Sequence, residues 1–164
     1  MKSSFKVLIF FFSIVFLACD SGVPLEIDKQ HIVAQAKGPL FSGLNTATID
    51  FKIKEFLPVD VEISQIASAR LKSLAVNPIG EGLPSVSSYT VLVASPNQEM
   101  NQIGFLNAVQ EGEASLVIAK EQPFMKDILK DPSQTLVIDF DLAEDYFDNL
   151  TFELTLEWEI HVTK

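Results

Sequence analysis

Cys19 is the only cysteine in this chain of 164 residues, so a disulfide within the chain is excluded. It follows Ala18, just beyond a nearly continuous apolar run at residues 7–17. This run is shorter than the roughly 20 apolar residues that a transmembrane helix needs. Lys2 and Lys6 precede the run, as positive charge precedes the apolar centre of a secretory signal peptide. The pattern predicts a signal peptide over residues 1–18.

The residues before this cysteine resemble the lipobox of bacterial lipoproteins, in which Leu, a small residue and Gly or Ala precede Cys. Ala18 matches that pattern, whereas Phe16 and Leu17 stand where Leu and a small residue are usual. The resemblance implies cleavage between Ala18 and Cys19 and a diacylglycerol thioether on the cysteine sulfur, a strong nucleophile. Two or three acyl chains anchor stably, because each buried methylene contributes about 0.8 kcal/mol. The alternative is an ordinary signal peptide cut near Ala18 or Ser21, which leaves a free thiol.

The densest group of carboxylates lies in the sequence DFDLAEDYFDN, residues 139–149. Calcium takes six to eight oxygen ligands, and a hairpin with this sequence offers several. The ligand order and central glycine of an EF-hand are absent, so no cofactor is expected and calcium is the alternative. The candidate calcium ligands are Asp139, Asp141, Glu144, Asp145 and Asp148. A solvated strand face followed by a polar turn would explain the same residues without a metal.

The sequence offers little for nucleophilic catalysis. Its two histidines are His31, in a segment without a clear pattern, and His161, on the polar side of the last predicted strand. A Ser–His–Asp triad needs a histidine within hydrogen-bond reach of a serine, and no G-x-S-x-G motif is present. Acylation would block Cys19 as a nucleophile. We therefore predict a protein that is not an enzyme, with a carboxylate-based hydrolase, calcium-dependent in one version, as a rival hypothesis.

Aromatic side chains in turns are the candidates for a binding surface. Tyr146 and Phe147 fall in a predicted turn, and the alternative for Phe147 is a plug in the end of the fold. Trp158 lies on the apolar side of its strand and is expected in the core. Amide-rich loops between residues 97 and 110 suit a glycan or a peptide, so a carbohydrate-binding module is a further alternative.

The clearest periodicity lies at residues 150–162, where apolar and polar side chains alternate without a fault. Alternation places successive side chains on opposite faces of a strand, so a long, half-buried strand is predicted. Shorter patterns predict further strands at residues 49–54, 59–64, 89–95, 114–119 and 135–142 and, after a helical turn at 64, at 69–76. Loops are predicted at residues 77–88 and 95–102, a helix from Pro123 to before Asp131, and a second helical turn at 143–147.

These elements predict an all-β fold, a single antiparallel β-sandwich of about 7–8 strands with one or two short helices. Parallel strands would need more helical crossovers than the pattern contains. The predicted organisation is a signal peptide (1–18), a lipidated N-terminus with tether and first extended segment (19–44), and the sandwich (45–164). The sequence LAC, the strand ARLKSLAV after a helical turn and the long last strand resemble small β-sandwich lipoproteins of Gram-negative bacteria. That resemblance implies a fold and no chemistry.

The net charge narrows the range of partners. It is −10 for the whole chain, and residues 19–164 hold 22 acidic against 10 basic residues. Such a chain lacks the clustered cations that bind nucleic acid or anionic lipid surfaces. We therefore expect an envelope lipoprotein, held on the inner or the outer membrane by its lipid. Its expected role is a binding or structural accessory whose partners are envelope proteins, reached by loops or a sheet edge.

Overall fold

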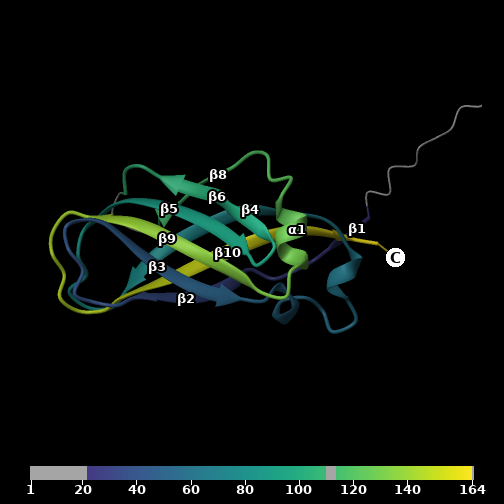
Figure 1. Ribbon diagram of the computed structural model, residues 1–164, viewed down its shortest axis with the longest axis horizontal. Helices are drawn as coiled ribbons and strands as arrows, with labels where there is room; N and C mark the ends of the chain where they lie inside the picture. The colour runs from purple at the N-terminus through teal and green to yellow at the C-terminus, as the bar shows by residue number, and fades with distance from the viewer. Residues whose placement is uncertain (1–21, 110–113, 164) are drawn as a thin grey trace, which may run out of the picture.

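The computed structural model describes residues 22–109 and 114–163, and the predicted lipid attachment site lies outside them. Within these residues, antiparallel pairings join ten strands into one sheet (Figure 1). The strands are β1 (Val23–Leu25), β2 (Gln30–Ala36), β3 (Gly43–Phe51), β4 (Ile66–Ile79), β5 (Val86–Ser95), β6 (Gln98–Leu106), β7 (Ala114–Ser115), β8 (Val117–Ile118), β9 (Gln134–Leu142) and β10 (Leu150–Val162). The helices are η1 (Ile53–Glu55), η2 (Ile63–Gln65) and α1 (Met125–Lys130). The predicted all-β antiparallel fold is confirmed.

The sheet consists of two halves joined by a thin seam. Its strand order is β7-β4-β10-β2-β3-β9-β5-β6-β8, with β1 paired to the end of β10. Only one residue pair, Gln35 with Thr48, joins β2 to β3. At the two outer edges of the sheet, the short strand β7 pairs with β4 and the short strand β8 pairs with β6. The sheet therefore folds over on itself, and the segment from β7 to β8 spans the gap between its two outer edges.

The apolar side of β10 fills the space between the two halves. Its alternate residues are buried while those between them are half-buried, as the period of two predicts. The Phe152 ring lies 4.8 Å from the ring of Phe140 on β9 and 6.0 Å from that of Tyr89 on β5. Trp158 is buried as expected. These contacts pack the two halves face to face through aromatic and aliphatic side chains.

Two predicted elements, a strand and a helical turn, are wrong. In both segments the backbone groups form hydrogen bonds other than those of the predicted element. Residues 59–64 are not a strand: Val61 N–H donates to the Pro58 carbonyl in a turn, and Val59 is 95% exposed. Residues 143–147 are bends and a bridge rather than a helical turn. There, Ala143 N–H donates to the Ser85 carbonyl of another loop, so the segment forms no helical hydrogen bonds of its own.

Strands also extend into segments with no strand prediction. β2 and β1 pair with β10, so the first extended segment predicted within residues 19–44 is part of the sheet. The predicted loop at 95–102 is instead a tight turn followed by β6, whose first three residues are exposed. Most of this segment pairs through its backbone with β5 and buries little. Its side chains therefore carry no periodic signal.

Replacing Phe152 with alanine tests the packing between the halves. We expect Phe152→Ala to lower the free energy of unfolding by about 3–5 kcal/mol, because it removes a ring that contacts both β9 and β5. Urea denaturation measures this change. The matched control is Thr151→Ala on the opposite side of the same strand, which should shift stability by roughly 0.5 kcal/mol or less. Equal losses in the two variants would contradict the packing described.

Candidate functional site

Three loops meet at the end of the molecule opposite β1 and the last residues of β10, at the left of Figure 1. They are residues 37–42, 80–85 and 143–149, and we call them the tip loops. Leu40 and Tyr146 exchange two backbone hydrogen bonds of 2.7 and 2.9 Å, and Ala143 N–H donates to the Ser85 carbonyl at 3.0 Å. Backbone pairing thus holds loops together that lie far apart in the sequence.

Side chains brace the tip loops further. Ser42 N–H donates to Asp145 Oδ1 at 2.8 Å, and Gly38 N–H donates to Asn149 Oδ1 at 3.0 Å. A Cβ atom on Gly38 would lie 2.5 Å from the carbonyl oxygen of Asp148. Only glycine allows the two backbones to approach this closely. The tip loops are therefore a defined surface rather than loose connections.

Two phenylalanines project from this surface. The paired residues Leu40 and Tyr146 are buried and half-buried against the core. Phe41 and Phe147, the next residues along each loop, are 59% and 73% exposed. Adjacent residues of an extended segment point to opposite sides, so the pairing that buries Leu40 directs both rings into solvent. Large exposed apolar groups that lie together are a usual mark of an interaction site.

The sequence pattern predicted the exposure of one of these two phenylalanines. Phe147 is exposed as predicted and does not plug the end of the fold, whereas Tyr146 is half-buried. Phe41 was not among the candidates. It lies in GPLFSG, where a large aromatic residue stands between turn-forming residues, and this is the signal that could have located it. Its neighbour across the pairing could not be inferred from that sequence.

The five candidate calcium ligands do not come together as one site. Asp139 and Asp141 are half-buried on the outward side of β9, where Asp139 accepts a 2.6 Å hydrogen bond from Thr46 Oγ1. Asp145 accepts the Ser42 N–H, and Glu144 and Asp148 are exposed in the loop. Among residues 22–109 and 114–163, no three His, Cys, Asp or Glu side chains form a group that could hold a metal ion.

The tip loops are nevertheless acidic. Their charged side chains are Lys37, Glu81, Glu144, Asp145 and Asp148. The loops that carry the two exposed rings thus hold four carboxylates against one ammonium. The tip loops therefore combine apolar surface with a negative potential, which suits a partner of complementary charge.

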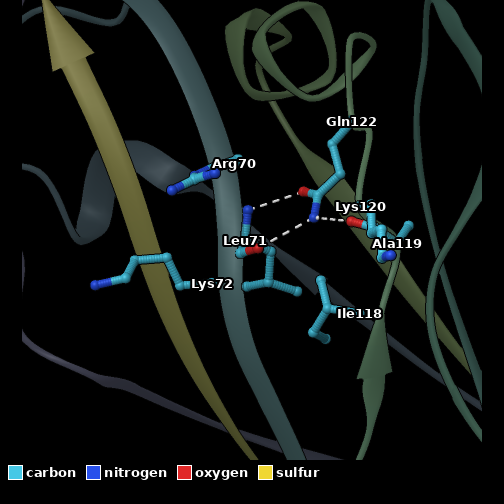
Figure 2. Close-up of a pocket in the computed structure, with 7 residues that line it drawn as sticks. All are labelled: Arg70, Leu71, Lys72, Ile118, Ala119, Lys120 and Gln122. Carbon is cyan, nitrogen blue, oxygen red and sulfur yellow. Dashed lines mark hydrogen bonds between the residues drawn. The ribbon is translucent and has the colours of Figure 1, made fainter.

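A second surface lies between β4 and residues 118–122 (Figure 2). Gln122 points at the edge of β4, where its Oε1 accepts the Leu71 N–H at 2.8 Å and its Nε2 donates to the Leu71 carbonyl at 3.0 Å. The amide group thus occupies the place of a neighbouring strand. Arg70 and Lys72 extend over β10 instead, where they pair with Glu159 at 2.6 Å and Glu157 at 3.0 Å. On this second surface, Gln122 therefore satisfies the backbone edge of β4, and carboxylates of β10 neutralise Arg70 and Lys72.

The ion pairs on this outer face shift carboxyl pKa values. A hydrogen bond from Lys72 together with its positive charge lowers the pKa of Glu157, and a hydrogen bond from Arg70 lowers the pKa of Glu159. Both histidines lie on the same face beside carboxylates: His31 Nδ1 is 3.4 Å from Glu153, and His161 Nε2 is 3.9 Å from Glu159. On this face the carboxylates Glu157 and Glu159 of β10 pair with Arg70 and Lys72 of β4 and with Lys29, which precedes β2.

No family model, curated protein or solved structure matches this chain. Among the residues that the structure describes, no helix has the length and apolar character to cross a membrane. The fold and the site together define an all-β domain with β1 and the last residues of β10 at one end and an acidic, aromatic surface at the other.

Gly38→Ala tests the geometry of the tip loops. The added methyl group would overlap the Asp148 backbone, so we expect a loss of about 1–3 kcal/mol in the free energy of unfolding. Gly104→Ala is the matched control, because its Cβ would lie 3.3 Å from side-chain atoms of Leu116, which can shift. Thermal melting compares the two variants. A larger loss in Gly104→Ala would contradict the close backbone approach at Gly38.

The ion pairs of the outer face should make the free energy of unfolding depend on pH. Glu157 and Glu159 have lowered pKa values when folded, so the unfolded chain binds more protons near their ordinary pKa of about 4.3. Their stabilising effect is present above that pH and is lost as the pH falls through the folded values. We expect the urea midpoint to fall between about pH 5 and pH 3. Glu157→Gln with Glu159→Gln should flatten this fall, and an unchanged slope would contradict the role of these pairs.

Proposed function

We propose that this protein is a lipid-anchored accessory of the cell envelope that binds an envelope protein through its tip loops and catalyses no reaction. The observation that carries this proposal is the position of the tip loops. They lie at the end of the domain opposite β1, the strand that follows the predicted lipid attachment site (Figure 1). A tether at one end would leave the other end free to meet a partner.

The distances support this arrangement. An extended chain spans at most about 3.6 Å per residue, so Cys19 lies within roughly 14 Å of Val23. The proposed anchor therefore keeps the β1 end of the domain near the bilayer. β10 connects the tip loops with that end of the domain and spans roughly 40 Å at about 3.4 Å per residue. The tip loops would stand at about that height above the membrane surface.

The placement of the histidines supports a role without catalysis. Each lies on the outer face with a carboxylate as its neighbour, and His31 also lies 3.4 Å from Thr155 Oγ1. The His31 side chain is 57% exposed and that of His161 29%, so both lie at the surface of the strand face rather than in a buried cleft. The negative charge of the chain likewise favours a protein partner over nucleic acid.

Fatty-acid labelling tests the anchor. We expect cells grown with labelled palmitate to transfer the label to the wild-type chain, and intact mass to show acyl chains on residue 19. Cys19→Ser should carry no label, because serine lacks the thiol that forms the thioether. Ser21→Ala is the matched control and should label like the wild type. Absence of label and of acyl mass on the wild-type chain would refute the anchor.

A further inference from the structure

We infer that the tip loops bind a basic protein segment that presents an apolar side chain beside lysine or arginine. This inference rests on the proposed function, for which it names the class of partner. Its starting point is the distribution of exposed apolar residues. Of the ten large apolar side chains exposed in the described residues, five lie in the tip loops or at the adjoining strand ends. These five are Phe41, Leu44, Ile79, Leu83 and Phe147.

The two rings occupy neighbouring positions on one side of the pairing. Leu40 lies opposite Tyr146 in an isolated antiparallel bridge, and the same register continued by one residue puts Phe41 opposite Asp145, two residues before Phe147. In an antiparallel pair such diagonal residues share a face and lie about 7–8 Å apart. An aliphatic or aromatic side chain of a partner can therefore contact both rings at once. Aromatic anchors of this kind supply much of the affinity in protein interfaces.

Charge determines what surrounds that apolar contact. The tip loops carry Glu81, Glu144, Asp145 and Asp148 against Lys37 alone. Like charges that face each other across an interface cost affinity. A second copy of these loops, an acidic protein and an anionic lipid surface would all meet that repulsion. A segment with lysine or arginine around an apolar residue can contact both rings and also pair with the carboxylates of the tip loops.

The surface is also ordered before it binds. The Leu40–Tyr146 backbone pair, the Ser42–Asp145 hydrogen bond and the close approach at Gly38 fix the loops that carry both rings. Binding to an ordered surface loses little conformational entropy, which leaves more of the contact energy as affinity. The tip loops thus meet the requirements for recognising a short segment of a partner.

Site-specific photocrosslinking in intact cells tests the inference on the full chain. A photoreactive phenylalanine analogue replaces Leu83, an exposed residue of the tip loops, and crosslinked peptides are sequenced. We expect a peptide of another protein with net positive charge and at least one large apolar residue. The same analogue at Val59, which is exposed outside the tip loops, is the positional control and should not yield that peptide.

Two sets of variants separate the apolar and the charged contributions. Phe41→Ser with Phe147→Ser should lower the crosslink yield at least about tenfold, as loss of interface anchors does. Glu144→Lys with Asp148→Lys keeps both rings and Asp145, and should also lower the yield. Val59→Ser is the matched control and should leave it unchanged. Thermal melting of each variant confirms that the domain remains folded.

Several outcomes would overturn the inference. Crosslinks only to lipid, to a second copy of this chain or to an acidic peptide would do so, as would a yield that neither set of variants changes. No crosslink at position 83 would also overturn it. Failure of the anchor is a separate result, because palmitate labelling reports on Cys19 without reference to the tip loops. A crosslinked basic peptide from a chain that carries no label would refute the anchor alone.

Discussion

The structure depends on one constraint, which is that every second side chain of β10 must lie in a dry interior. This strand pairs with β4 and β2 along its sides and with β1 at its end. Phe152 reaches from it to both β9 and β5 of the facing half. On its other side, Glu157 and Glu159 pair with Arg70 and Lys72 of β4 and with Lys29, the residue before β2. A slip of one residue would bury these carboxylates and expose the rings, so the register is strongly fixed.

Side-chain amides complete the fold at a strand edge and at a strand end. Gln122 satisfies both backbone groups of Leu71 at the edge of β4. Gln134, the only buried polar residue among those described, accepts the Ile53 N–H and donates to carbonyls of Ile128 and Asp131. Unpaired edge groups either cost free energy when buried or invite pairing with another chain when exposed. A glutamine amide offers one donor side and one acceptor side, so it can substitute for a strand at such places.

What could be predicted from the sequence follows from how each element is stabilised. The strand at 150–162 was predictable because its side chains alternate between core and solvent. β6 was not, because it pairs with β5 through its backbone while its first residues remain exposed. In the candidate site, Phe147 was predictable as an exposed residue of a turn. Its neighbour Phe41 required the pairing of Leu40 with Tyr146, a contact between residues 106 positions apart that no local pattern encodes.

The same pairings separate the two ends of the molecule. β1 pairs with the last residues of β10, so Val23 and Val162 lie side by side. With both ends of the described chain brought to one side, the loops at the other side connect strands and carry no terminus. Such loops can carry exposed phenylalanines and a surplus of carboxylates without disturbing the core on which they rest. The geometry that satisfies the backbone of the first and last strands is thus also the geometry that leaves an acidic, aromatic surface free to meet a partner.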